Sequence, residues 1–199
     1  MVRGITLRGS FVRPCVNNPP KYGVLIPAPG PKPSKITGGC EVLRLAARPL
    51  APCPMTLEEV KRWTAARPTL ADALGIEITA VADDYLEGRM PVDGRTHQPM
   101  GLLHGGASVA LAETLGSIAA TLRLPDPTTQ TCVGLEINAN HLKGVRDGWV
   151  RGRATPLHLG RRTQVWEIRI THEESGALVC VSRLTMAVID RPTATSNPA

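Results

Sequence analysis

The chain has 199 residues, enough for one domain with a substantial hydrophobic core, and a formal net charge of +6. The charge is uneven: residues 1–50 contain eight lysines and arginines against one acidic residue, whereas residues 51–199 contain 15 basic and 16 acidic residues. Because the body has no basic excess and only 3% of all residues are aromatic, the composition argues against a nucleic-acid partner.

The cysteines and the hydropathy argue against a disulfide-linked secreted protein, a zinc protein and a membrane-spanning protein. The five cysteines include no C-x-x-C pair, and their odd number is typical of a reducing compartment, so we predict a cytoplasmic protein without a metal site. No apolar run approaches 18 residues, and the N-terminus lacks the continuous apolar segment of a secretory signal. We therefore expect no membrane-spanning helix.

Residues 1–54 contain ten of the eighteen prolines, which predicts a disordered or loosely attached extension that folding does not require. A translation start placed too far upstream would produce such a segment, with Met55 as the alternative start. We predict that the functional domain covers residues 55–190, followed by a flexible tail over residues 191–199.

Cap and turn signals divide the first part of the domain. Thr56 and Glu59 form a capping-box pattern that opens a short helix, and Gly75 is placed to end a second helical turn. Alternating apolar residues then predict a hairpin of two strands. The predicted elements are a helix over 56–66, a turn of helix over 69–74, and strands over 76–80 and 85–92.

The sequence from His104 to Leu122, HGGASVALAETLGSIAATL, predicts one long helix. It is small and apolar on nearly all sides, which is typical of a buried helix. Glu113 is its one ionisable group beyond the start, and two glycines at the start would let a ligand approach the backbone N–H groups at the positive helix end. A glutamate on a helix is usually just solvated, and a glycine pair is usually just a turn. Both features together on a helix with no other charge favour a functional site that binds a ligand.

Four strand-like runs follow the helix, over 131–142, 149–157, 164–172 and 178–189. The short gaps between them imply that successive strands are antiparallel neighbours in a meander. We predict an α+β domain in which an antiparallel sheet wraps one central helix. Two such helices side by side, with Gly116 permitting close approach, would hide the apolar surface in a dimer.

Four segments carry a resemblance to a known family: MPVDGRTHQPMGLLHGGASVALAET, VGLEINANHLKG, RGRATPLHLGRRTQVWEIRI and CVSRLTMAVI. They resemble the hotdog-fold thioesterases of the PaaI-like and 4-hydroxybenzoyl-CoA types that carry a catalytic Glu. The similarity is closest to the 1,4-dihydroxy-2-naphthoyl-CoA thioesterases of menaquinone biosynthesis, with the proofreading thioesterases of enterobactin synthesis as near siblings. Residues 1–54 have no counterpart in the family.

The resemblance implies a role for each of five residues. Glu113 matches the nucleophile or general base, and the Gly105 backbone N–H matches the donor that polarises the thioester carbonyl. Gln98 matches the side chain that orients the carbonyl or water, and His104 matches a histidine that positions the thioester. Ser117 matches a hydroxyl that helps to orient the attacking group. The resemblance also implies a homodimer or dimer of dimers, with each site shared between two subunits.

Thioester chemistry agrees with this assignment without a metal or a cofactor, because coenzyme A is part of the substrate. Attack turns the carbonyl oxygen into an oxyanion, which N–H groups at a helix start stabilise. A thiolate with a pKa near 8.5 leaves readily, so a carboxylate that activates water or attacks directly is sufficient. Gly106, Glu113 and Ser117 lie at positions that share one helix face.

Other polar residues are candidate contacts to the coenzyme A moiety. Arg161 and Arg162 are the favoured ligands for its phosphates, although a solvated turn is the alternative for either. The remaining candidates for substrate binding are Gly106, Asn140, His141, Lys143 and His158.

Three other hotdog or hydrolase functions fit less well. A hydratase of this fold would use Asp and His together. A non-catalytic acyl-CoA binder would be expected to lose Glu113. A Ser/His/Asp hydrolase would need the motif G-x-S-x-G, which Gly106-Ala-Ser108 does not complete. We therefore expect a thioesterase acting on an aryl- or acyl-CoA. A proofreading enzyme for carrier-protein thioesters and a non-catalytic acyl-CoA-binding protein remain the alternatives.

Overall fold

The computed structural model describes residues 52–191. The predicted extension over residues 1–51 and the predicted tail over residues 192–199 lie outside the described residues. At the two limits of the described part, the Cys53 backbone N–H donates to the Asp83 carboxylate at 2.8 Å, and the Arg191 backbone N–H donates to the Thr129 carbonyl at 2.8 Å. Both Cys53 and Arg191 are thus bonded to the domain, although they lie just outside its predicted limits of 55–190.

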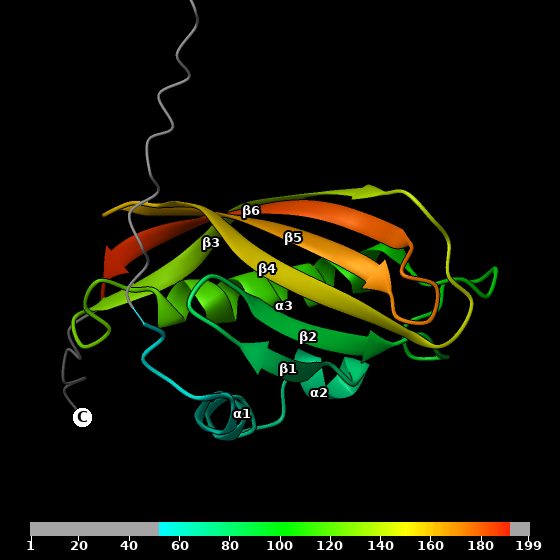
Figure 1. Cartoon of the computed structure of the whole chain (residues 1–199), viewed down its shortest axis with the longest axis horizontal. Coiled ribbons are helices and arrows are strands. Elements are labelled where there is room, and N and C mark those ends of the chain that lie inside the picture. Colours follow the sequence, from blue (N-terminus) through cyan, green and yellow to red (C-terminus); the bar gives the residue numbers. More distant parts are fainter. Residues whose placement is uncertain (1–51, 192–199) are drawn as a thin grey trace, which may run out of the picture. The chain divides into compact units, whose positions relative to one another are not determined.

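The two short helices form where their caps predicted them. In α1, Leu57–Thr64, the Thr56 hydroxyl accepts from the Glu59 N–H while the Glu59 carboxylate accepts from the Thr56 N–H at 2.7 Å, which completes the capping box. Helix α2, Leu70–Leu74, ends at Gly75, whose φ of 68° lies in the left-handed region. Both helices lie beside β1 at one side of the molecule (Figure 1).

Six antiparallel strands curve around α3, Gly105–Leu122, in the spatial order β1-β2-β4-β5-β6-β3 (Figure 1). This arrangement confirms the predicted α+β class and the wrapped helix. The strand bounds are β1 Glu77–Val81, β2 Leu86–Pro91, β3 Gln130–His141, β4 Trp149–Leu159, β5 Thr163–His172 and β6 Leu178–Asp190.

The prediction of a complete meander was wrong for the first of the last four strands. Strands β4, β5 and β6 are sequential neighbours, but β3 pairs with β6 at the sheet edge, from Gln130 opposite Asp190 to His141 opposite Cys180. After β3 the backbone N–H groups of Leu142 and Lys143 still donate to Val179 of the β6 strand, so the chain stays at this edge before crossing to β4. The longer connection over residues 142–148 permits this crossing, whereas a tight hairpin would not.

Within one chain, helix α3 is buried on the side that faces the sheet and only partly buried on the other, so burial on all sides, as predicted, would need a second copy. Its buried residues include Leu111, Leu115 and Ala119. A single curved sheet covers half of a helix. The partly exposed stripe comprises Val109, Ala110, Glu113, Thr114, Ser117, Ile118 and Thr121.

Close helix–sheet packing depends on small residues. Gly88 of β2 and Gly152 of β4 are paired in register, and a Cβ on either would collide with the Leu115 side chain. Gly116 faces Leu184 of β6 in the same way. Gly116 therefore lets α3 approach its own sheet, and the predicted role in helix–helix contact with a second copy was wrong.

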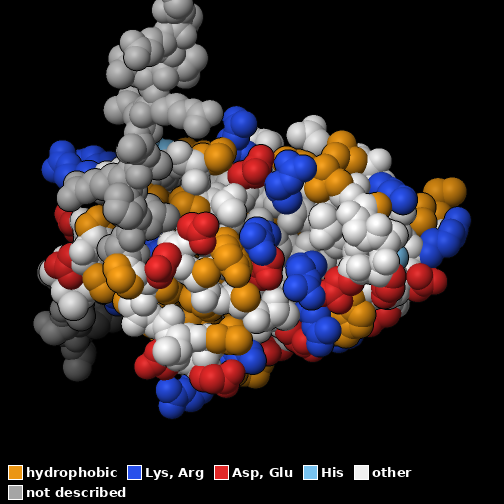
Figure 2. Space-filling view, viewed as in Figure 1, with side chains coloured by type: hydrophobic (Ala, Val, Ile, Leu, Met, Phe, Trp, Pro, Cys, Tyr) orange, Lys and Arg blue, Asp and Glu red, His pale blue; other side chains and the backbone are white. Residues whose placement is uncertain are grey.

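Charges on the sheet are paired locally. Glu87, 8% exposed, accepts from Arg153 Nε at 2.6 Å and lies 3.7 Å from Arg151 Nη1. Basic and acidic side chains are interspersed on the face seen in Figure 2. Across residues 52–191, no helix combines the length and the apolar character that a membrane span requires.

Candidate active site

The start of α3 leaves one backbone donor free. His104 is the N-cap, and its Nδ1 accepts from the Gly106 N–H at 2.8 Å. The N–H groups of Ala107 and Ser108 both donate to the His104 carbonyl. Within residues 52–191 the Gly105 N–H has no acceptor, so it is the free donor at the positive end of the helix dipole. Gly106, a predicted substrate contact, has its N–H already occupied by His104.

A cavity of about 330 Å³ opens beside this donor. It brings together four residues predicted from the sequence, which come from the loop before α3, the helix start and the end of β3: Gln98, Gly105, His141 and Lys143. Leu102, Leu142 and Val179 supply apolar walls. A Cβ on Gly105 would lie 2.8 Å from His141 Nε2, so the imidazole lies directly over this glycine. The cavity therefore combines a backbone donor with polar side chains and an apolar lining, as ligand sites commonly do.

Gln98 is held with its amide group oriented. The Met100 backbone N–H donates to Gln98 Oε1, and the Gln98 backbone N–H donates to the Leu102 carbonyl at 2.8 Å. The Gln98 NH₂ group has no acceptor among the described residues. It is thus available as a second donor at the cavity.

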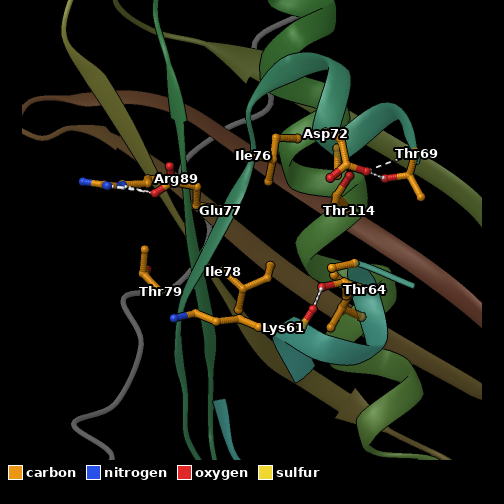
Figure 3. Close-up of a pocket in the computed structure, with 13 residues that line it drawn as sticks. Lys61, Thr64, Thr69, Asp72, Ile76, Glu77, Ile78, Thr79, Arg89 and Thr114 are labelled. Atoms are coloured by element: carbon orange, nitrogen blue, oxygen red, sulfur yellow. Dashed lines mark hydrogen bonds and ion pairs between the residues drawn. The ribbon is translucent and has the colours of Figure 1, made fainter. Parts of the chain in front are cut away.

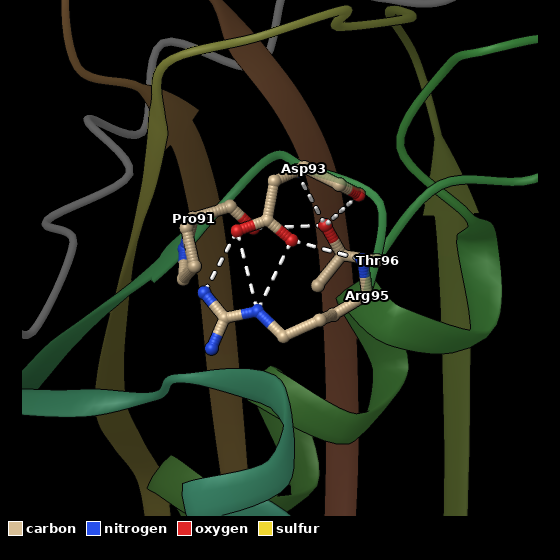
Figure 4. A network of polar contacts seen from close by, with 4 residues as sticks. All are labelled: Pro91, Asp93, Arg95 and Thr96. Atoms are coloured by element: carbon tan, nitrogen blue, oxygen red, sulfur yellow. Dashed lines mark hydrogen bonds and ion pairs between the residues drawn. The ribbon is translucent and has the colours of Figure 1, made fainter.

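A polar network fixes the loop that carries Gln98 and His104 (Figure 4). Thr96 is 1% exposed, and its hydroxyl donates to the Pro91 carbonyl at 2.8 Å and accepts from the Asp93 N–H at 3.1 Å. The Thr96 carbonyl in turn accepts from the His104 N–H at 2.8 Å. Hydrogen bonds from the Arg95 side chain and backbone lower the pKa of Asp93, so this carboxylate is charged at neutral pH and holds the turn.

We predict that Thr96→Val destabilises the protein by about 1–3 kcal/mol, because the isosteric side chain leaves the buried Pro91 carbonyl and Asp93 N–H without partners. Urea unfolding measures this. Thr155→Val, at a strand position whose hydroxyl makes no hydrogen bond among the described residues, is the control and should be close to neutral. Equal stabilities of the wild type and Thr96→Val would contradict the role of this network.

Glu113 and Ser117 form a second group, farther along α3. Ser117 Oγ donates to Glu113 Oε1 at 3.1 Å, which confirms that the two side chains share a face. Glu113 is partly exposed, whereas the apolar helix sequence predicted a buried carboxylate. The physical reason is that Glu113 belongs to the stripe of α3 that the sheet does not cover.

The two groups are separated within one chain. Gly105 and Glu113 are eight residues apart on α3, which corresponds to about 12 Å along the helix axis. A carbonyl that accepts from the Gly105 N–H therefore lies too far from the carboxylate of the same chain for attack. Their shared position along one helix was correctly predicted, but the geometry of one chain does not bring them to one reacting atom.

The remaining predicted residues lie at both ends of the sheet. Asn140 is exposed on β3, next to His141. Arg161 and Arg162 line another cavity, of about 340 Å³, beside Gln130, and the His158 ring packs against Gly160 in the same turn. Since β3 runs from Gln130 to His141, these two ends are about 36 Å apart. The arginines and the Gly105 cavity are thus not adjacent in one chain.

A cavity that the sequence did not predict lies between α1, α2, β1 and α3, with a volume of about 510 Å³ (Figure 3). Ile76, Ile78 and Ile118 give it apolar walls, and Thr114, the residue after Glu113, adds a hydroxyl. The signal available in the sequence was the spacing: Thr114 and Ile118 are one helical turn apart and immediately follow Glu113 and Ser117. No three His, Cys, Asp or Glu side chains in the described part of the chain gather as a metal site requires.

Comparison with known proteins identifies the family. Residues 100–179 match the family model described as Thioesterase superfamily. The proofreading thioesterase EntH of Cronobacter turicensis is 54% identical over 135 residues, which cover 68% of this chain and 95% of the relative. The 1,4-dihydroxy-2-naphthoyl-CoA hydrolase of Escherichia coli is 56% identical over 116 residues, covering 58% of this chain and 83% of the relative.

Solved structures agree with these relatives. The crystal structure of a thioesterase from Haemophilus influenzae matches with a TM-score of 0.64 and 50% identity, covering 71% of this chain and 95% of that one. The chain therefore belongs to the thioesterase superfamily, as an enzyme with the hotdog fold that its sequence predicted.

Proposed function

We propose that this enzyme hydrolyses an aryl-CoA thioester to the free acid and coenzyme A, with 1,4-dihydroxy-2-naphthoyl-CoA as the specific substrate. The observation that carries the proposal is the free Gly105 N–H at the positive end of α3, which opens onto a cavity beside the Gln98 amide. The relative of Escherichia coli named 1,4-dihydroxy-2-naphthoyl-CoA hydrolase supports the choice of acyl group. The free thiols of Cys53, Cys132 and Cys180 support a reducing, cytoplasmic location.

In the proposed reaction the thioester carbonyl oxygen accepts from the Gly105 N–H and from the Gln98 NH₂ group. Glu113 removes a proton from water, which attacks the carbonyl carbon; alternatively, the Glu113 carboxylate attacks first and water hydrolyses the resulting anhydride. The negative charge that develops on the carbonyl oxygen is stabilised by the two donors and the helix dipole. The tetrahedral intermediate then collapses, the C–S bond breaks, and the thiolate of coenzyme A leaves and takes up a proton.

Because donor and carboxylate are about 12 Å apart along α3 of one chain, we propose a homodimer as the minimal active unit, with each site shared between two chains. Strand β3 is a twelve-residue sheet edge with a row of unpaired backbone groups, and Val133 and Leu135 on it are 42% and 59% exposed. Such an edge is a template for pairing with a second copy. Antiparallel pairing of two β3 strands would place the His141 end of one chain, which covers Gly105, opposite the Gly134 region of the other, which lies against Glu113.

The same pairing would also unite the proposed coenzyme A contacts. It brings the Gln130 end of the second chain, where Arg161 and Arg162 lie, toward Lys143 of the first. Three cations from two chains would then face the phosphates, while Asn140 and His141 border the pantetheine chain. The contacts that are about 36 Å apart in one chain thus become neighbours in the dimer.

The cavity of about 510 Å³ beside Thr114 supports an aromatic acyl group. Its volume lies within the range typical for small-molecule sites, and its isoleucine walls with threonine hydroxyls suit a ring that carries hydroxyl groups. A carrier-protein thioester is the second candidate substrate, because the relative that is 54% identical is named a proofreading thioesterase.

A substrate panel tests the proposal. Thiol release is measured with naphthoyl, benzoyl and aliphatic CoA thioesters, and with the same acyl groups on a carrier protein. We expect the hydroxylated aromatic CoA thioesters to exceed the aliphatic ones in kcat/KM by at least about tenfold, since the cavity discriminates by fit. Faster hydrolysis of carrier-bound groups would favour the proofreading function, and absence of thiol release from every thioester would refute catalysis.

A further inference from the structure

Gly134 of β3 lies against the carboxylate of Glu113. A Cβ on Gly134 would be 3.0 Å from Glu113 Oε1 and 4.0 Å from its Cδ, and apart from Gly134's chain neighbours no other described atom would lie within 4 Å. Gly134 is exposed, and the one close neighbour that a side chain there would meet is this oxygen of the proposed catalytic group. A contact of 3.0 Å is tighter than nine in ten contacts of real Cβ atoms, so the carboxylate would have to shift by a few tenths of an ångström.

The backbone itself does not require glycine at this position. The described glycines with a positive φ are Gly75, Gly101, Gly148 and Gly176. Gly134 is outside this group and pairs with Met186 of β6, at the last paired position before the register shifts. A glycine within a strand weakens it and often marks a site where another group approaches closely. The approaching group here is the Glu113 carboxylate.

The strand changes its course at the same point. A β-bulge lies between Gly134 and Glu136, so Leu135 has no partner in the register with β6. Bulges are frequent beside active sites, where they redirect side chains or backbone. Gly134 faces α3 by ordinary strand alternation, as does Cys132, whose thiol contacts Thr121 of α3. After the bulge the inward positions become Ile137 and Ala139, while Leu135 remains 59% exposed on the free edge.

The two oxygens of Glu113 are consequently distinguished. Oε1 accepts from Ser117 Oγ at 3.1 Å and rests against Gly134, whereas Oε2 has no hydrogen-bond partner among the described residues. A carboxylate held at one oxygen presents the other in a defined direction. Ser117 supplies the hydrogen bond, and Gly134 supplies the space.

We propose that Gly134 is a positioning residue for thioester hydrolysis: its missing side chain lets Glu113 Oε1 pack against β3, which directs Oε2 toward the reacting carbon or its water. The inference rests on the proposed function of Glu113. It predicts that one methyl group at position 134 misplaces the carboxylate by a few tenths of an ångström without disturbing the fold.

The experiment compares Gly134→Ala with Gly94→Ala in the full chain. A Cβ at Gly94 would have no atom within 4 Å, and the φ of Gly94 is likewise outside the left-handed region. We expect kcat of Gly134→Ala to fall about tenfold with KM changed less than about twofold, because a misplaced base slows the chemical step. The melting temperature should be unchanged or slightly higher, since alanine lowers the entropy of the unfolded chain. Gly94→Ala should retain wild-type kcat.

A double-mutant cycle separates positioning from a merely structural effect. In a Glu113→Ala background, Gly134→Ala should cause no further loss of the residual rate, because the group through which it acts is absent. An equal loss in both backgrounds, an unchanged kcat in Gly134→Ala, or loss of the folded oligomer in light scattering would each overturn the proposal. Full activity of a folded Glu113→Gln protein would instead refute the proposed function, so the two failures are distinguishable.

Discussion

Replacing Glu113 by Gln should lower the hydrolysis of an aryl-CoA by at least about two orders of magnitude, since general-base catalysis contributes about 10²–10⁴-fold and a nucleophilic role more. Glutamine keeps the volume and can still accept from Ser117 Oγ, but it neither takes a proton from water nor attacks the thioester. Substrate affinity should change little, because the carbonyl and the nucleotide are bound by other groups. Steady-state kinetics of both proteins measure the effect.

Two controls make this result interpretable. Glu113 is partly exposed and has no cationic partner within residues 52–191, so Glu113→Gln should leave the melting temperature nearly unchanged. Gln98→Ala should show a smaller loss of kcat, because Gln98 orients the reacting groups without supplying the base. A well-folded Glu113→Gln protein that keeps more than about a tenth of wild-type turnover would be inconsistent with general-base or nucleophilic catalysis by Glu113.

Local signals were sufficient to predict the elements of the fold. The capping box of Thr56 and Glu59, the helix stop at Gly75 and the alternation of the strands are short-range effects, and each appears in the structure close to its predicted place. Strand order is a long-range property. The position of β3 depends on where α3 returns the chain to the sheet, which the spacing of turns does not encode, so the predicted meander failed at this strand.

Residues of the candidate site could be named from the sequence, but their arrangement in space could not. The structure brings Gln98, Gly105, His141 and Lys143 together around one cavity. Glu113 and Ser117 form a separate hydrogen-bonded pair farther along α3. Helix periodicity suggested a helix buried on all sides, because it cannot indicate that a single sheet covers only half of the circumference. The role of Gly134 was also invisible in the sequence, since it depends on a contact between residues 21 positions apart.

Mixing two inactive variants should restore activity if the active site is shared between chains. Gly105→Pro removes the free N–H at the first position of the helix, where proline is well tolerated. A proline also requires an extended residue before it, and His104, with ψ of 132°, already has that conformation. The three atoms nearest to a Cβ at position 105 all belong to the exposed side chain of His141, which would have to move. Loss of this donor should reduce kcat by about 10²–10³-fold.

In a mixed dimer of Gly105→Pro and Glu113→Gln chains, one composite site keeps both the Gly105 N–H and the Glu113 carboxylate, and the other site lacks both. Half of the dimers formed at random are mixed and each has one intact site of two, so refolding the two variants together should recover about a quarter of the wild-type rate. Each variant refolded alone under the same conditions is the control and should stay inactive. If donor and carboxylate acted within one chain, despite their separation of about 12 Å on α3, the mixture would show no more activity than the separate variants.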